Sequence, residues 1–164
     1  MDLRLTKVDT YFAPAKKLDQ GDIYLQTIKV LGKRKLIKVL NLLPNIVAII
    51  NMERQILFAN DSFIKTINME NFEDGLGMRL GDLFACVNSH DTEFGCGTGK
   101  DCKYCSLILT FLKSQETGVR QENVGTITVE RDGKNVALTF HVIASPLTID
   151  NEIFYIIILT PKNK

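Results

Sequence analysis

The last quarter of the sequence alternates apolar and polar residues with a period of two, which restricts this part of the chain to β-strands. The runs are separated by RDGK, in which Asp132-Gly133 is a strong turn signal, and by the polar IDNE. We therefore expect three antiparallel strands, with Pro146 at the end of the middle one, where a missing N–H donor costs least. The three runs are TITVE (126–130), NVALTFHVIA (135–144) and EIFYIIIL (152–159).

Two more strands and two helices are predicted upstream. The apolar runs IVAII (46–50) and QILFA (55–59) flank the polar NMER, a pattern typical of a hairpin. Asn60 can then cap a short helix that runs through Ile67, because its side-chain oxygen accepts from a free N–H at the helix start. SLILTFLKSQ (106–115) has the apolar spacing of a longer helix. The fold class predicted is α+β, with one five-stranded antiparallel sheet and helices on one face.

The N-terminal part is predicted to be an arm followed by an amphipathic helix. Residues 1–21 show little periodicity and include Pro14, which suggests a loosely packed arm. Apolar residues recur every three or four positions over 22–43, a stripe that Gly32 interrupts, so two helical pieces are allowed. We expect this helix to pack on the outer face of the sheet or to dimerise with a second copy. The domain proper then covers 44–160, with a cysteine-rich insertion at 86–105.

Size and charge set the broad class. A chain of 164 residues suits one domain, and its apolar run IFYIIIL is far shorter than the ~20 residues that span a bilayer. The start, MDLRLTKVDT, lacks the apolar run of a secretory signal, so we expect a cytoplasmic protein with no membrane contact. The basic stretch KVLGKRKLIK has no interleaved aromatics and no nucleic-acid motif, so no nucleic-acid partner is expected.

All four cysteines lie within twenty positions, spaced C-x9-C-x5-C-x2-C, and form the candidate metal site. In a reducing compartment such clusters bind metal or do redox work more often than they form permanent disulfides. Four thiolates satisfy zinc or an iron–sulfur cluster, and the glycines between the cysteines let the backbone turn its N–H groups inward. The last two cysteines precede the helix at 106–115, whose positive end favours thiolate. The four are Cys86, Cys96, Cys102 and Cys105.

Other interpretations of these residues stay open. The cysteines could form a redox-switchable thiol and disulfide set, or serve as inert small core residues. His90 could replace Cys86 as a ligand, although a loop histidine is the simpler interpretation, and His141 on a predicted strand has a structural role by default. No phosphate loop, nucleophile elbow or metal-hydrolase motif is present, and GCGTGK (95–100) is one residue short of a phosphate loop. We therefore expect no enzyme, with a thiol-dependent enzyme as the weakest alternative.

The sequence resembles a known family at two places. The element order, together with LPNIVAIINMERQILFANDSF (43–63), resembles a PAS sensory domain, in which an asparagine at the position of Asn60 caps the helix after the second strand. GLGMRLGD (75–82), Cys86 and GCGTGKDCKYC (95–105) resemble a four-cysteine subgroup found ahead of bacterial histidine kinases. The resemblance implies a PAS-like sheet and a helical flank enclosing a pocket. It also implies a sensory, two-component role, with a histidine kinase or another signalling protein as partner.

The resemblance also bears on cofactors and output. Haem is not favoured, because haem-binding PAS domains commonly present an axial histidine on the helix that corresponds to 106–115, which has none. Flavin or a small organic ligand stays open, in an apolar pocket whose side chains could equally fill the core. The residues of this pocket are Phe58, Phe63, Leu109 and Phe140.

We expect a non-catalytic module that senses redox state, oxygen or metal through the four cysteines. It would act as a homodimer through the N-terminal helix or on a separate protein, because the sequence ends at LTPKNK without a signalling helix. The alternative is a structural use, in which zinc stabilises a dimerisation or adaptor domain.

Overall fold

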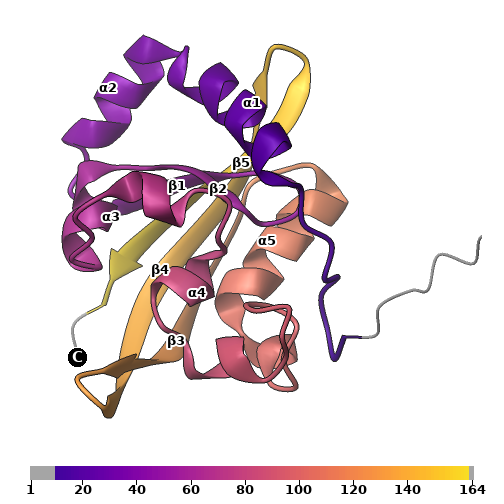
Figure 1. The fold of residues 1–164 in the computed structure, drawn as a ribbon, viewed down its shortest axis with the longest axis vertical. Coiled ribbons are helices and arrows are strands. Elements are labelled where there is room, and N and C mark those ends of the chain that lie inside the picture. The colour runs from indigo at the N-terminus through magenta and orange to yellow at the C-terminus, as the bar shows by residue number, and fades with distance from the viewer. Residues whose placement is uncertain (1–9, 163–164) are drawn as a thin grey trace, which may run out of the picture.

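The computed structural model describes residues 10–162 and has one five-stranded antiparallel sheet in the order β2-β1-β5-β4-β3 (Figure 1). The strands are β1 (Ile46–Ile50), β2 (Ile56–Ala59), β3 (Gln121–Arg131), β4 (Lys134–Ile149) and β5 (Glu152–Pro161). The α-helices are α1 (Gln20–Leu31), α2 (Arg34–Leu42), α3 (Asp61–Thr66), α4 (Leu80–Leu83) and α5 (Ser106–Thr117). Short 3-10 helices are η1 (Phe72–Gly75), η2 (Val87–His90) and η3 (Cys102–Tyr104). The α+β class and all five predicted strands are confirmed.

Tight turns join the three C-terminal strands. Asp132 and Gly133 have φ values of 50° and 75°, and Asp150 and Asn151 have 49° and 65°. Two successive left-handed residues match the twist of the flanking strands, which is why Asp, Asn and Gly occur here. The strand β4 is longer than predicted and continues through Pro146. A proline is tolerated inside it because β3 pairs with β4 only as far as Ala144, which leaves one side of β4 unpaired beyond that residue.

The capping role predicted for Asn60 is confirmed, and this buried side chain does more than cap a helix. Its Oδ1 accepts from Phe63 N at 3.1 Å at the start of α3 and from Val47 N at 3.0 Å in β1. Its Nδ2 donates to the carbonyls of Leu40 and Asn45, both at 2.9 Å. One amide therefore joins α2, β1 and α3.

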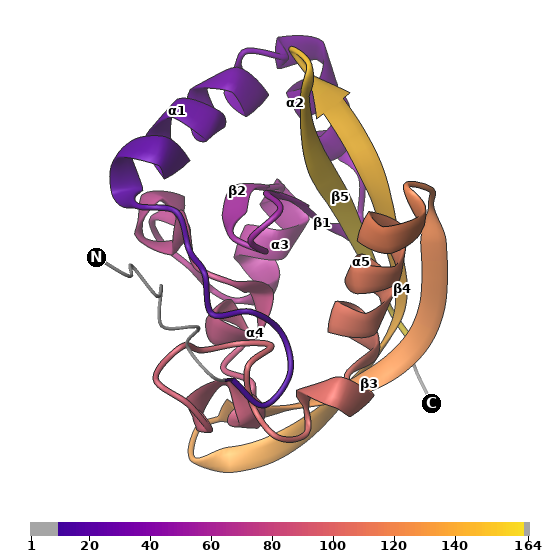
Figure 2. The ribbon, with the colours of Figure 1, turned by 90° about the vertical axis from the view of Figure 1, so that its right-hand side faces the viewer.

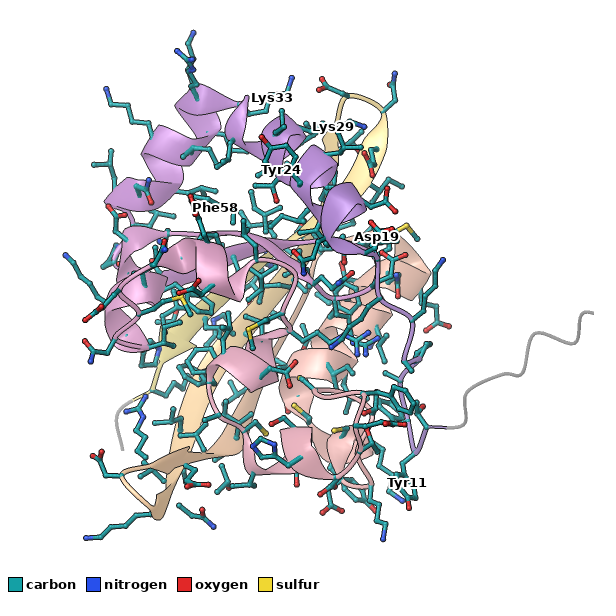
Figure 3. All side chains as sticks on the ribbon, viewed as in Figure 1. Tyr11, Asp19, Tyr24, Lys29, Lys33 and Phe58 are labelled. Atoms are coloured by element: carbon teal, nitrogen blue, oxygen red, sulfur yellow. The ribbon has the colours of Figure 1, made fainter. Side chains whose placement is uncertain are left out.

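The N-terminal helices cover one face of the sheet. They form two pieces, broken at Gly32, and pack in an apolar cluster with side chains of the first, second and last strands. This is the outer-face packing expected as one of two alternatives. Two lysines reach the β4–β5 turn (Figure 3). Lys29 of α1 pairs with Glu152 at 2.7 Å, and Lys33, which lies just after α1, pairs with Asp150 at 2.9 Å. The cluster contains Ile23, Val30, Leu40, Val47, Ile49, Leu57, Phe58, Ile149 and Phe154.

The opposite face carries the main core and the remaining helices. Phe84 packs against Phe63 and Phe140 with ring centroids 5.4 and 5.9 Å apart, and Phe111 of α5 meets Tyr155 edge-on at 4.9 Å. The start of α5 lies so close to β3 that a Cβ at position 125 would overlap Ser106, which requires glycine there. The segment before α5, which carries the cysteines, is thereby fixed against the sheet. No helix among residues 10–162 is long and apolar enough to cross a membrane.

Candidate metal centre

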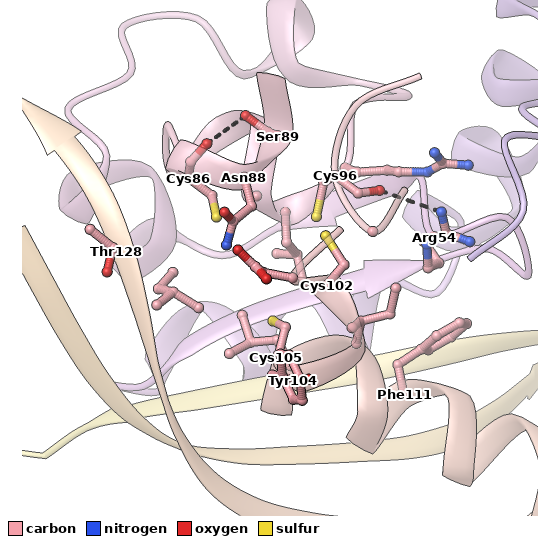
Figure 4. Close-up of a pocket in the computed structure, with 18 of the residues that line it drawn as sticks. Arg54, Cys86, Asn88, Ser89, Cys96, Cys102, Tyr104, Cys105, Phe111 and Thr128 are labelled. Atoms are coloured by element: carbon pink, nitrogen blue, oxygen red, sulfur yellow. Dashed lines mark hydrogen bonds between the residues drawn. The ribbon is translucent and has the colours of Figure 1, made fainter. Parts of the chain in front are cut away.

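A cavity of about 220 Å³ lies between the cysteine-rich residues 86–105, helix α5 and the sheet, and all four cysteines line it (Figure 4). We call residues 86–105 the cysteine segment and this space the cysteine cavity. Apolar side chains such as Ile108, Phe111 and Ile127 form its floor, and the guanidinium groups of Arg54 and Arg79 lie at its edge. The structure therefore brings together the four residues predicted to form one site.

Cys86 and Cys96 are placed by the short helix α4. Cys86 follows this helix, donates its N–H to Gly81 O at 2.8 Å and pairs with Val129 of β3 in an isolated bridge. Cys96 donates its N–H to Asp82 Oδ1 at 3.0 Å. A Cβ at position 81 would lie 2.5 Å from Cys96 Sγ and 3.4 Å from Cys86 Cβ. Gly81 is therefore needed for these two cysteines to lie on the same side of α4.

Cys102 and Cys105 lie immediately before α5, as predicted. Cys102 is buried and begins η3, and its carbonyl accepts from Cys105 N at 3.0 Å. Cys105 is the N-cap residue of α5. The helix therefore presents its free N–H groups to the cavity from the side of Cys105.

Burial determines the protonation of these thiols more than the helix does. It raises the pKa of Cys96 to about 12 and raises the pKa of Cys86 and Cys105 as well. Backbone N–H groups of Ile108 and Leu107 lower the pKa of Cys105 only in part. The helix start was expected to favour thiolate, but desolvation outweighs it here. Without a bound cation, these three thiols are protonated at neutral pH.

The sulfurs surround the cavity and do not converge on one point. Within residues 10–162, no three His, Cys, Asp or Glu side chains stand close enough together to hold a single metal ion. His90 is not among the residues that line the cavity, and His141 pairs with Glu122 at 2.9 Å on the sheet. Of the residue types that commonly bind metals, the cysteines are the main candidates at this cavity.

The four apolar residues predicted to line a ligand pocket are not brought together. Phe63 and Phe140 belong to the core beneath α3 and α5, whereas Phe58 lies in the cluster on the other face of the sheet. Leu109 is 37 % exposed on α5. None of the four lines the cysteine cavity.

Sequence reasoning missed Arg79, a wholly buried side chain beside the cysteine segment. Its relative exposure is 0 %, and burial lowers the pKa of its guanidinium. Its Nε donates to Glu53 O at 3.1 Å, Nη1 to Phe94 O at 3.1 Å and Nη2 to Lys16 O at 2.8 Å. Arg79 therefore joins the β1–β2 turn, the cysteine segment and the arm through their carbonyl groups.

Arg54, also missed, is 8 % exposed and lies in the turn between β1 and β2. Its Nη2 donates to Pro14 O at 3.0 Å and more weakly to Cys96 O at 3.4 Å. Burial, with Arg79 close by, lowers the pKa of Arg54 to about 10, so Arg54 stays charged at neutral pH, as arginine side chains in proteins do. Two buried cations therefore flank a cavity lined by four thiols.

The arm is hydrogen-bonded to the cysteine segment at Tyr11 and Ala13, and residues 14–18 are held by side chains outside that segment, contrary to the loose packing expected of the arm. Tyr11 N donates to Thr98 O at 3.1 Å and Ala13 N to Gly97 O at 2.9 Å, and Ala13 is buried. Figure 2 shows the arm running from α1 along this segment. The two arginines supply donors to the arm carbonyls that a periodicity pattern does not reveal. The first nine residues of the predicted arm lie outside the described residues.

Comparison with solved structures identifies the fold. Neither a protein-family model nor a curated protein matches the sequence. The PAS domain of nitrogen regulation protein NR(II) from Vibrio parahaemolyticus matches with a TM-score of 0.53 and 16 % identity, over 77 % of this chain and 97 % of that one. The chain has a PAS-like fold. A PAS domain from a Colwellia psychrerythraea protein (TM-score 0.55, 10 % identity, 81 % and 97 % covered) and one from a two-component sensor histidine kinase (0.52, 11 %, 81 % and 98 %) agree. At these identities the likeness is one of fold alone.

Proposed function

We propose that this PAS-like chain is a non-catalytic sensory module whose cysteine cavity is the sensing element. The observation that carries the proposal is that all four cysteines line one cavity although they are spread over the cysteine segment. The fold supports a signalling role, because similar structures include PAS domains of a sensor histidine kinase and of a nitrogen regulation protein. Redox state, oxygen and metal availability are the stimuli that a four-thiol site can register.

We further propose that the cavity binds a metal centre through its four cysteines. A single zinc ion holds four sulfurs about 2.3 Å from itself and so about 3.8 Å from one another. The sulfurs here line a space of about 220 Å³ without converging on one point, so the proposal covers zinc and an iron–sulfur cluster alike. Such a centre would supply thiolate coordination that changes with oxidation or metal loss. The apolar floor would exclude water from it.

The output is proposed to leave through the arm and the first helix. Ala13 pairs with Gly97 inside the cysteine segment, and the arm continues into α1 after the capping residue Asp19. A change in the cysteine segment would therefore pull on the arm and on the start of α1. A change transmitted through α5 would also have to move the sheet, whereas one transmitted through the arm would not.

A second copy of the chain is proposed to receive this movement at the outer face of α1. Four apolar side chains on that helix are exposed, with Ile28 at 51 %, and α1 places them away from the buried Ile23 and Val30. A stripe of this kind suits a parallel helix from a second copy or a helix of a separate signalling protein such as a histidine kinase. The stripe consists of Tyr24, Leu25, Ile28 and Leu31.

Two other uses of the cavity are the competing proposals. A purely structural zinc would stabilise the cysteine segment of an adaptor domain without sensing. A small organic ligand would occupy the same space, which the apolar Ile108, Phe111 and Ile127 favour. A thiol enzyme is less well supported, since burial raises the pKa of three of the thiols and makes them poor nucleophiles.

Amide hydrogen exchange tests the sensing proposal. Protein isolated anaerobically is compared with the same protein after chelator treatment and after air oxidation. We expect the amides of Tyr11 and Ala13 and those of residues 95–105 to lose protection together, while β4 and β5 stay unchanged. Equal protection of the arm in all three states would refute the sensing role and leave the structural one.

A further inference from the structure

Two buried guanidinium groups lie beside the cysteine cavity, and no described carboxylate pairs with either of them directly. Within residues 10–162, the hydrogen-bond acceptors of Arg54 and Arg79 are all backbone carbonyls, and neither forms an ion pair with a carboxylate. A buried charge without a counter-charge costs several kcal/mol. Asp82, which lies nearby, already accepts from Cys96 N. Asp82, and for Arg79 also Glu53, raise the pKa of these guanidinium groups from a distance, but neither carboxylate is paired with them directly.

Arg54 also occupies a backbone position that does not suit it. Its φ is 69°, in the left-handed region where a residue with a Cβ is strained and glycine or asparagine is preferred. The hairpin requires this conformation, because Arg54 N donates to Asn51 O and Asn51 N to Gln55 O across the turn. A charged side chain that is both buried and attached to a strained backbone position points to a role beyond folding.

The guanidinium of Arg54 lies against the cysteine segment. A Cβ at position 97 would be 3.1 Å from Arg54 Nη2 and 3.2 Å from its Nε, so only glycine allows this close approach. Arg54 Nε is buried and has no hydrogen-bond partner, and the residue lines the cavity together with the cysteines (Figure 4). An unused charged donor therefore lies at the edge of the space that the four sulfurs surround.

We propose that Arg54, backed by Arg79, is the counter-cation of a four-thiolate metal centre in the cysteine cavity. This inference rests on the proposed metal centre. Four thiolates around a zinc ion, or around an iron–sulfur core of charge +2, leave about two negative charges, which two guanidinium groups balance. Arg54 is then a positioning residue, which orients the segment at Cys96 and stabilises the charge of the centre without binding the metal.

Substitution of Arg54 in the full chain tests this role. Arg54→Met removes the charge at similar length, Arg54→Lys keeps it, and Arg131→Met removes an exposed guanidinium elsewhere as the matched control. Each protein is loaded anaerobically in two separate experiments. The first uses zinc against a competing chromophoric chelator, and the second uses iron and sulfide. We expect Arg54→Met to weaken zinc affinity or cluster retention about 10- to 100-fold, as loss of a residue that supports metal ligands does.

The charge-keeping and control variants separate the counter-cation role from mere packing. Arg54→Lys should retain most of the affinity, and Arg131→Met should equal the wild type. If a cluster forms in Arg54→Met, its reduction potential should be more negative, because the added electron loses a nearby positive charge. The metal-free Arg54→Met protein also loses the hydrogen bonds to Pro14 O and Cys96 O, so its melting temperature is measured separately from its metal affinity. Arg54→Gly, which suits the left-handed turn, gives a second charge-free variant if the methionine variant does not fold.

The possible failures are distinguishable. If the wild type binds metal and Arg54→Met binds it equally well, with the same reduction potential, the counter-cation role is overturned. The metal centre itself then still stands. Equal losses in the lysine and methionine variants would show that guanidinium packing matters and charge does not. If the wild type takes up neither zinc nor a cluster, the metal centre itself fails, and the inference fails with it.

Discussion

The amide of Ala13 donates to the carbonyl of Gly97 at 2.9 Å, which makes the arm a hydrogen-bonded partner of the cysteine segment. Tyr11 and Thr98 extend this pairing at 3.1 Å, and Arg79 holds the arm further along, at Lys16. The first helix begins a few residues later, at Gln20. The cysteine cavity and the outer helix layer are thus connected by a short length of fixed backbone.

Substituting Gly97 should release the arm. Its φ is 91°, and a Cβ there would lie 2.6 Å from Ile108 Cδ1, so Gly97→Ala combines backbone strain with overlap. We expect a loss of about 3 kcal/mol or more in unfolding free energy and faster hydrogen exchange at Ala13. Gly118→Ala is the matched control, because Gly118 also has a positive φ but open space around it, and it should cost about 1 to 2 kcal/mol without affecting the arm. Unchanged exchange at Ala13 in Gly97→Ala would contradict the coupling.

Gly81→Ala should displace the Cys96 thiol. The new Cβ would overlap Cys96 Sγ, so we expect weaker metal uptake together with a loss of about 1 to 3 kcal/mol in stability. Gly21→Ala lies in α1, where a Cβ would meet only Asp19 Oδ1 at an ordinary contact distance of 3.4 Å, and should instead stabilise the protein by about 0.5 to 1 kcal/mol, without changing metal uptake. Denaturant unfolding and metal titration of both variants check this. Normal metal uptake in Gly81→Ala would mean that Cys96 does not need its present position.

The contact between α1 and the β4–β5 turn should depend on pH. Hydrogen bonds from Lys29 and Gln26 lower the pKa of Glu152 below its ordinary value of 4.5. A lowered carboxyl pKa gives stabilisation that is present above the unfolded-state pKa and is lost as the pH falls through the folded-state value. Glu152→Gln should therefore be less stable than the wild type at pH 7, and the difference should shrink and then vanish as the pH falls below 4.5 and through the lowered folded-state pKa. Urea unfolding at pH 7 and over a series of acid pH values measures this, and a difference that persists in strong acid would exclude the ionised carboxylate as its source.

A charge on the outer face of α1 should prevent self-association. Ile28→Glu places a carboxylate in the exposed apolar stripe, and we expect a shift from dimer to monomer in sedimentation, with the thermal midpoint of the domain little changed. Val124→Glu, on an exposed position of β3, is the control and should leave association unchanged. A wild type that stays monomeric at high concentration would remove the homodimer and leave a separate signalling protein as the partner.

The local parts of this structure were predictable from sequence. The alternating strands, the Asp132-Gly133 turn and the cap at Asn60 follow from period, turn chemistry and side-chain capping, all of which act over a few residues. The cysteine segment was also recognisable, because four rare and reactive residues lie within twenty positions. The full length of β4 was not predictable in the same way. Pro146 is tolerated inside β4 because β3 ends its pairing at Ala144, and the sequence around Pro146 does not show where β3 ends.

The remaining parts depend on contacts between distant positions. Arg79 binds carbonyls of the arm more than sixty residues away, and no local pattern separates it from a surface arginine. The predicted pocket residue Phe58 lies in β2, where every residue is buried, so alternation could not tell which face it occupies. Phe63 of α3 and Phe140 of β4 are core residues of the other face.

Metal analysis of protein purified without oxygen or chelator, combined with its visible absorption spectrum, tests the four-cysteine centre most directly. The predicted result is stoichiometric metal that disappears when Cys96 and Cys102 are both changed to serine: iron with a brown colour for a cluster, or zinc without colour. Protein that folds normally but contains neither iron nor zinc, in the wild type as in the double variant, would contradict it.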